Sequence, residues 1–353
     1  MEQNTKKGIA FAVLAAALYA INAPFSKLLL EFVPPTLMAG FLYIGAGVVM
    51  MVISFIKKVR KSEAKELPLT KSELPYTIAM ILLDIAAPIF LLLGLNATTA
   101  ANVSLLNNFK IVATAIIALM VFKEQISARL WFGILFVTLS CGILSFEDVS
   151  SLRFSYGSLF VLLAAVCWGF ENNCTRMISN KSSEEIVIIK GCFSGLGSLV
   201  IALLLGERIP GIKWVAAVML LGFIAYGLSI NFYIMAQKEL GAAKTSAYYS
   251  IAPFLGVAFS MILLGERPAI RFYVALVIMT VSTVLMVRDT IELQHNHEHT
   301  HTHSHVHSHG AVTHVHVHTH VHSHSHIHGT DNGNHEHMHC DLENHDHTHE
   351  TEE

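Results

Sequence analysis

Ten long apolar runs set the strongest limit on what this 353-residue chain can fold into. A helix that crosses a bilayer needs about 20 mainly apolar residues, whereas the strands of a membrane barrel alternate apolar and polar residues in short segments. The runs are of helical length and do not alternate, so they predict an all-α integral membrane protein. The expected spans are residues 8–30, 35–56, 76–95, 98–122, 129–146, 156–178, 186–205, 214–237, 242–265 and 270–287.

The low charge content excludes several classes of protein. Only 14% of the residues are charged, against about 25% in soluble domains. This deficit disfavours an ordinary soluble enzyme and a basic nucleic-acid-binding protein, so we expect no catalytic residues and no nucleic-acid partner. We expect a lipid bilayer and a small-molecule substrate as partners, and a homodimer is compatible with the sequence.

The distribution of charge divides the chain and orients it. All 23 Lys and Arg lie at or before Arg288, and all 22 His lie between His295 and His349. Counting the Lys and Arg of the loops with the N-terminus inside gives 15 inside and 5 outside. Because basic residues favour the cytoplasmic side, the count predicts a multi-pass protein of the cell membrane with both termini in the cytoplasm.

The apolar part contains an internal repeat. Leu14–Ala16 and Tyr19 match Leu163–Ala165 and Trp168 at an offset of 149 residues. A second match, at an offset of 142, relates Ala100, Ala101, Ser104 and Glu124 to Ala242, Ala243, Ser246 and Glu266. Each repeat has five spans, an odd number, so the second copy enters the membrane in the opposite orientation. Inverted repeats are typical of secondary transporters, in which two related halves move about a central site.

The matching motifs resemble those of the EamA family in the drug/metabolite transporter superfamily. The resemblance covers about residues 8–287 and includes Leu18-Tyr19-Ala20-Ile21-Asn22, Cys167-Trp168-Gly169-Phe170 and Ala252-Pro253 with Leu264-Gly265-Glu266. It implies a ten-helix bundle with a central substrate cavity. The first unit departs from the pattern, because Asn107-Asn108-Phe109-Lys110-Ile111 stands where the second has Ala252-Pro253. The predicted domains are an EamA-type repeat at 1–147, a second at 148–288, and a disordered tail at 289–353.

Charges inside the apolar runs point to function, because a charge at the centre of a membrane helix costs about 2.5–3.5 kcal/mol. Asp84 and Lys110 lie near the middle of their spans. They form either a static buried ion pair or part of a substrate or proton site, and Glu171 is the rival partner for Lys110. Lys27, Arg176 and Lys190 lie nearer to helix ends, so they are expected to extend to the surface.

Polar side chains at helical spacing extend the candidate site. Trp168, Glu171 and Asn172 share one helix face, and this face either lines a cavity or forms hydrogen bonds between helices. Tyrosines offer a flat apolar surface and a hydroxyl, which suits an organic solute. The residues predicted to bind substrate are Asp84, Lys110, Glu171, Asn107, Trp168, Asn172, Tyr19, Asn22, Tyr248 and Tyr249.

The tail has the composition of a metal-binding segment. Imidazole is a ligand for Zn²⁺, Ni²⁺, Co²⁺ and Cu²⁺, and a chain without a packable core is expected to be disordered. Such metal ions are expected on the tail, whereas transport itself is expected to need no cofactor. The candidate metal ligands are His295, His297, His299, His301, His303, His305, His307, His309, His314, His316, His318, His320, His322, His324, His326 and His328.

These observations favour a secondary transporter that moves small organic metabolites or amphiphiles by alternating access and carries a cytoplasmic metal-binding tail. One alternative is a carrier of transition metals (nickel, cobalt or zinc) or of metal chelates, with the tail as an ion collector. A third is a membrane-anchored metal-storage protein. The apolar part contains no His, which disfavours a metal path through it, and ten spans exceed what an anchor requires.

Overall fold

The computed structural model is described for residues 2–59, 69–123, 126–148, 153–178, 181–240, 242–309 and 312–327. The chain separates into two units, Met1–His295 and Asn296–Glu353.

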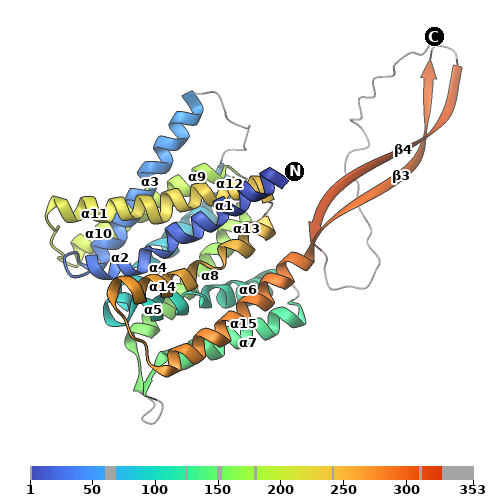
Figure 1. The fold of residues 1–353 in the computed structure, drawn as a ribbon. Helices are drawn as coiled ribbons and strands as arrows, with labels where there is room; N and C mark the ends of the chain where they lie inside the picture. The colour runs from blue at the N-terminus through green and yellow to red at the C-terminus, as the bar shows by residue number, and fades with distance from the viewer. Residues whose placement is uncertain are drawn as a thin grey trace. The chain divides into compact units, whose positions relative to one another are not determined.

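The first unit is a bundle of helices that follow the apolar runs (Figure 1). The residues matching the first predicted repeat form α1 (Glu2–Ala20), α2 (Asn22–Leu29), α3 (Pro35–Val59), η1 (Lys71–Glu73), α4 (Leu74–Ala97), α5 (Ala100–Leu106), α6 (Phe109–Phe122) and α7 (Ala128–Ser145). Those of the second form α8 (Tyr156–Met177), α9 (Ser183–Ile189), the π-helical η2 (Lys190–Ser194), α10 (Gly195–Leu204), α11 (Ile212–Gly222), the π-helical η3 (Phe223–Leu228), α12 (Ser229–Leu240), α13 (Ala242–Tyr249), α14 (Ala252–Leu264) and α15 (Ile270–Leu293). The short strands β1 (Phe146–Asp148) and β2 (Arg153–Phe154) pair antiparallel between α7 and α8.

Three of the expected spans are interrupted near their centres. The break between α13 and α14 precedes Pro253, which cannot donate a backbone hydrogen bond and therefore sits in the first turn of α14. The break between α5 and α6 has no proline and falls at Asn107 and Asn108. The Asn107 amide donates to the Val103 carbonyl as in a regular helix, whereas the Asn108 amide donates to the Leu105 carbonyl, which is a tighter turn. Asparagine favours caps and turns over helix interiors, which explains a break at this pair. The third break lies at Ile21, between α1 and α2.

Helices distant in the sequence pack against one another in matching pairs. α4 contacts α8 and α1 contacts α12, so the third and sixth spans pair as the first and eighth do. α7 contacts α15, and Figure 1 shows these last helices of the two halves side by side. The core inside this bundle includes Leu37, Leu92, Leu105 and Met279, all fully or almost fully buried.

Glycines allow the closest of these contacts. A Cβ atom on Gly191 would lie 2.4 Å from the Cα of Gly47, and one on Gly222 would lie 2.1 Å from the carbonyl oxygen of Leu42. α3 therefore meets η2 and α11 through main-chain contact. Gly191, Gly195 and Gly197 form one helix-packing face, because Gly195 also lies next to α3 and Gly197 lies next to Ile85.

Nine spans within the described residues are long and apolar enough to cross a membrane: Thr5–Leu29, Pro35–Lys57, Lys71–Ala97, Ala100–Phe122, Ala128–Ser145, Glu185–Leu204, Ile212–Gln237, Lys244–Leu264 and Ile270–Asp289. The one predicted span missing from this set is the sixth, 156–178, which coincides with the 22-residue helix α8. Its C-terminal half carries Glu171, Asn172, Asn173, Thr175 and Arg176, so it does not qualify by hydropathy. The structure thus contains the predicted helix as α8, while its passage through the membrane stays a prediction.

Part of the tail has extended backbone, and the predicted disorder of residues 289–353 stays a prediction. α15 continues to Leu293, and β3 (Gln294–His309) pairs with β4 (Val312–Ile327) in a two-stranded sheet. The alternation of His with Ser, Thr and Val has the two-residue period of a strand, which accounts for extended backbone here. Residues 328–353 lie outside the described part of the chain.

Candidate functional site

Two adjacent cavities lie inside the helix bundle. The charged cavity, of about 190 Å³, is lined by Tyr19, Tyr43, Ala46, Asp84, Lys110, Trp168, Glu171, Asn172, Val187, Lys190, Gly191, Tyr226 and Ile230. The tyrosine–asparagine cavity, of about 180 Å³, includes in its lining Tyr19, Asn22, Ser104, Asn107, Asn108, Lys110, Tyr233, Ser246, Tyr249, Ser250, Pro253 and Thr283. Tyr19 and Lys110 line both cavities, so they mark the boundary between them.

Three charged side chains meet at the charged cavity, and we call Asp84, Glu171 and Lys190 the buried triad. The Lys190 ammonium donates to Glu171 Oε1 and lies 3.7 Å from Asp84 Oδ2. The carboxylates are almost fully buried, with exposed fractions of 2% for Asp84 and 3% for Glu171. The triad joins α4, α8 and η2, because each of these elements supplies one charge.

Two hydroxyl groups complete the polar contacts of the carboxylates. Tyr43 on α3 donates from its hydroxyl to Asp84 Oδ1 at 3.2 Å, and Thr175 donates to Glu171 Oε1. Asp84 Oδ2 is buried and accepts no hydrogen bond from the described residues. Glu171 Oε1 therefore accepts two hydrogen bonds, whereas Oδ2 of Asp84 has only the more distant Lys190 ammonium beside it.

The lysine of the triad corrects two predictions. Lys190 was expected to extend to the surface, but it is turned inward between the two carboxylates. Asp84 does not form the ion pair with Lys110, because its cationic neighbour is Lys190, whereas the alternative of a substrate or proton site at Asp84 stays a prediction. The reason lies in the helix start: α9 begins at Ser183, capped by the Ser182 side chain, so Lys190 sits deeper than in a span starting at residue 186.

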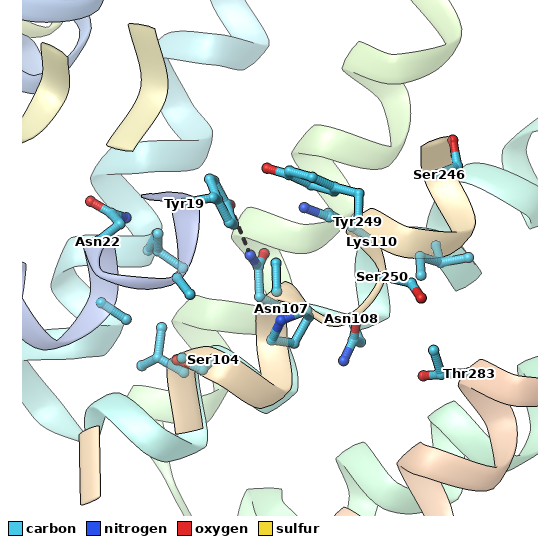
Figure 2. Close-up of a pocket in the computed structure, with 18 of the residues that line it drawn as sticks. Tyr19, Asn22, Ser104, Asn107, Asn108, Lys110, Ser246, Tyr249, Ser250 and Thr283 are labelled. Atoms are coloured by element: carbon cyan, nitrogen blue, oxygen red, sulfur yellow. Dashed lines mark hydrogen bonds between the residues drawn. The ribbon is translucent and has the colours of Figure 1, made fainter. Parts of the chain in front are cut away.

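Aromatic rings and amides form the other cavity. Asn107 donates from Nδ2 to the Tyr19 hydroxyl at 3.2 Å, as the dashed line in Figure 2 marks. The rings of Tyr19 and Tyr249 are 6.0 Å apart, and Tyr249 makes an edge contact with Tyr233 at 5.0 Å. Asn22 donates to the Tyr226 hydroxyl at 3.1 Å. This wall offers flat apolar surface with hydroxyl and amide groups at its edges.

Lys110 has a different environment from Lys190. Its ammonium lies 5.4 Å from the centre of the Tyr19 ring, a cation–π arrangement. Within the described part of the chain, no carboxylate lies within ion-pair distance of this ammonium. Figure 2 shows Lys110, Asn107 and Asn108 around the break between α5 and α6. The side chain is half-buried, so the cavity boundary carries a cation that has no acidic partner among the residues that the structure describes.

Two amide atoms on the same break also lack partners. Asn107 Oδ1 and Asn108 Nδ2 are buried and make no hydrogen bond with the described residues. The exposed fractions of the two asparagines are 8% and 5%. Buried polar groups are nearly always satisfied, so an unused acceptor and an unused donor beside a cavity indicate room for water or solute polar groups.

A second group of charges holds the turn between α4 and α5. Lys27 donates to the carbonyl oxygens of Leu95 at 2.5 Å and Thr98 at 2.7 Å. Glu266 accepts from the backbone amides of Ala100 at 2.8 Å and Ala101 at 2.9 Å. Lys27 was expected to extend to the surface, and it caps the C-terminal end of α4 instead. Glu266 holds this turn, and its counterpart in the first repeat, Glu124, lies outside the described residues.

Nine of the ten predicted substrate-binding residues line one or both cavities. Tyr248 does not, because its side chain is 38% exposed on the other face of α13 from the cavity. Sequence reasoning missed Tyr43, Tyr226, Asn108 and Lys190. The aromatic residues carried no signal that separates them from core residues, whereas Asn108 adjoins a predicted site residue.

The metal-binding expectation concerns residues whose side chains are not described. The backbone of His295–His309 and of His314–His326 lies in β3 and β4, and His328 lies outside the described residues. Among the side chains that the structure describes, no group of three His, Cys, Asp or Glu could hold a metal ion. Metal binding by the tail therefore stays a prediction.

Comparisons with known proteins agree with this architecture. A solved crystal structure aligns with a TM-score of 0.56 at 17% sequence identity, covering 82% of this chain and 98% of the other. An uncharacterized transporter from Methanothermobacter thermautotrophicus is 23% identical over 274 residues, which are 72% of this chain and 78% of that relative. The model of the EamA-like transporter family matches twice, over residues 6–146 and 155–288. The chain is a multi-pass membrane protein and belongs to the EamA-like transporter family.

Proposed function

We propose that this protein is a secondary transporter for small organic solutes and favours solutes that carry a negative charge. The observation that carries the proposal is Lys110, a cation at the boundary of two cavities with no acidic partner among the described residues. Lys190 lies between the two triad carboxylates, whereas Lys110 has no carboxylate beside it among the described residues, so Lys110 is a positive charge available to a solute.

The size and walls of the cavities suit an organic molecule. A cavity of about 150 Å³ holds a benzene-sized molecule, and each cavity here is larger. Tyr19 and Tyr249 provide ring faces for an apolar body, while Lys110 and Asn108 provide donors for an acceptor group. A ring with one acidic substituent would therefore place its acidic group at Lys110 and its ring against the tyrosines.

The proposed mechanism is alternating access between two inverted repeats. The two family matches divide the helices into related halves, and the contacts α4–α8 and α1–α12 relate the halves pairwise. Breaks at Asn107–Asn108 and before Pro253 lie in equivalent spans, and α5 packs on α14. Broken helices at the midplane are a common feature of transporter binding sites. We further propose that both termini are cytoplasmic, as the loop charges indicate.

Solutes that share a phenyl ring and differ in charge test the proposal. Purified protein in proteoliposomes would be given benzenesulfonate, phenyl glucoside or phenyltrimethylammonium, which are anionic, neutral and cationic and cross lipid slowly. We expect benzenesulfonate to enter fastest. Equal or faster uptake of the cation would contradict the charge preference, and no uptake above protein-free vesicles for any of a broad set of organic solutes would contradict the organic-solute carrier.

The tail forms a separate part of the proposal, and only the sequence supports it. Between His295 and His328, imidazoles recur at every second residue over most of the segment. We propose that the tail binds Zn²⁺, Ni²⁺, Co²⁺ or Cu²⁺ without forming the solute path. Removing residues 294–353 leaves α15 whole and should abolish high-capacity metal binding in equilibrium dialysis while leaving solute uptake intact. Loss of metal flux with retained folding would favour the alternative, a metal or metal-chelate carrier.

A further inference from the structure

The buried triad carries one more negative than positive charge. Asp84 and Glu171 are both buried, and Lys190 is the cation between them. The other titratable groups facing the cluster are Tyr43 on α3, Tyr226 on η3, Cys174 on α8 and, across the cavity, Lys110. The ammonium of Lys110 lies over the Tyr19 ring and does not bridge to the triad.

An unbalanced charge on buried side chains is costly, and a proton removes the imbalance. Ionised carboxylates taken out of water are tolerated when each is paired and hydrogen-bonded. Glu171 meets this condition through Lys190 and Thr175, whereas Asp84 Oδ2 has no hydrogen-bond donor among the described residues. A proton on Asp84 would give the cluster zero net charge.

A proton fits this place better than a metal cation. Hard cations such as Ca²⁺ take six to eight oxygen ligands, and Mg²⁺ needs near-octahedral geometry. Here the Lys190 ammonium already occupies the space between the two carboxylates, and it would repel a second cation. The bound species that the geometry admits is therefore small enough to reside on a carboxylate oxygen.

The triad also spans the two family-matched segments. Asp84 belongs to the segment 6–146, and Glu171 and Lys190 belong to the segment 155–288. Lys190 is the first residue of the π-helical η2, and π-helical turns are frequent at functional sites. Because the charged cavity shares Tyr19 and Lys110 with the tyrosine–asparagine cavity, a change of charge on the triad acts both on the contact between halves and on the site proposed for the solute.

We propose that the Asp84–Glu171–Lys190 triad is a proton-binding site, and that its protonation couples proton movement to solute movement. The coupling rests on the proposed transport function, whereas the proton site itself does not. When the triad holds a proton, the interface of α4 with α8 and η2 is neutral; when the proton leaves, the interface carries a net negative charge. The proton passes between water and a carboxylate oxygen, with no other bond made or broken.

Infrared difference spectroscopy tests the site without any solute. Protein in nanodiscs would be titrated between about pH 4 and about pH 9, a range that brackets carboxyl groups in ordinary and buried settings. We expect a carbonyl band of a buried, protonated carboxyl group in the native protein and its loss in Asp84→Asn. Glu31→Gln, which removes an exposed acid, is the matched control and should keep the band. Absence of the band throughout, or its persistence in both Asp84→Asn and Glu171→Gln, would overturn the proposal.

Folding of the variants is checked in the same samples. Asp84→Asn and Glu171→Gln retain side-chain shape, and a single size-exclusion peak with native helix content shows that the protein is folded. If Asp84→Asn does not fold, the spectrum of Glu171→Gln decides, because a shared proton site must change its band position or titration range when either carboxyl group is altered. An unchanged band there counts against the triad.

Flux measurements separate the site from the transport function. An imposed pH gradient should concentrate benzenesulfonate several-fold in vesicles with the native protein, and Asp84→Asn should show equilibration without accumulation. Native protein that transports solute but ignores the pH gradient would overturn the coupling and leave the transporter proposal standing. A titrating carboxyl band without uptake of any organic solute would leave the proton site standing and remove the proposed function.

Discussion

Lys110 and Lys190 are two lysines at the walls of one cavity, and they differ in what surrounds them. Lys190 lies between two buried carboxylates, whereas Lys110 lies over an aromatic ring with no acid beside it in the described part of the chain. A cation built into a cluster stabilises its neighbours, and removing it leaves them unpaired. A cation without acidic partners remains available to a solute. The contrast shows that a lysine inside one helix bundle can either stabilise buried carboxylates or remain available to bind a solute.

The largest effect is expected from removing the cation of the triad. Lys190→Met leaves Asp84 and Glu171 buried without a positive partner, so the free energy of unfolding should fall by about 3–5 kcal/mol. Thermal or denaturant unfolding in detergent would measure this change. Lys71→Met is the control, because Lys71 is exposed at the start of η1 and should change the free energy of unfolding by at most about 0.5 kcal/mol. Equal costs for the two variants would contradict the comparison.

Removing the other lysine should change transport and spare stability. Lys110→Met loses a charge-assisted contact with the solute, worth about 1.5–3 kcal/mol, or roughly a ten- to hundredfold loss in benzenesulfonate uptake. Its unfolding midpoint should stay near that of the native protein. Uptake assays with Lys110→Arg, which keeps the charge, should show partial activity. Uptake at the native rate by Lys110→Met would show that Lys110 does not contact the solute and would contradict the difference in role between Lys110 and Lys190.

A smaller effect is expected at the amide that orients Tyr19. Asn107→Ala removes the hydrogen bond to the Tyr19 hydroxyl, a contribution of about 1 kcal/mol and hence about a fivefold change in apparent affinity. Competition between labelled and unlabelled benzenesulfonate would measure it. Tyr19→Phe loses the same bond from the other side, so the double variant should be no worse than either single variant. Additive losses would show that Asn107 contacts the solute by a separate route.

A comparable effect, on stability alone, is expected where charges hold the turn between α4 and α5. Glu266→Ala removes the acceptor for two backbone amides at the start of α5 and should cost about 1–2 kcal/mol of unfolding free energy. Unfolding in detergent measures the change, with Glu31→Ala as a neutral control at an exposed acid. A null result would show that water replaces the carboxylate at this turn without loss.

The smallest effect on transport is expected from the tail. A chain ending at Leu293 keeps the hydrogen bond from Ser127 to Asp289 at the base of α15 and should transport benzenesulfonate at the native rate. The same truncation should lose metal binding, and in the full chain that binding should weaken below about pH 6, because free imidazoles protonate near about pH 6.5 and only the neutral form ligates. Metal binding that survives truncation would place the ligands in the bundle.

Hydropathy predicted the helices because lipid demands long apolar runs. It did not predict the break before Pro253, since a proline can also stand inside a continuous membrane helix, as Pro88 does in α4. The break at Asn107–Asn108 was not predicted, since asparagine within an apolar run is compatible with a continuous helix. Spacing along single helices brought nine of ten candidate residues to the cavities. It could not choose the partner of Asp84, because the choice depends on how α4, α8 and η2 face one another.

Gly191 follows Lys190 of the triad, and its close contact with Gly47 limits which residues the chain can carry at these two positions. A side chain at position 191 would displace the α3 backbone, and α3 also carries Tyr43, the hydroxyl donor to Asp84. A single methyl group added there would therefore disturb two of the groups that surround one carboxylate without touching a charge. In related chains, we expect substitutions at 47 and 191 to be accepted only together with changes at the acidic positions they indirectly support.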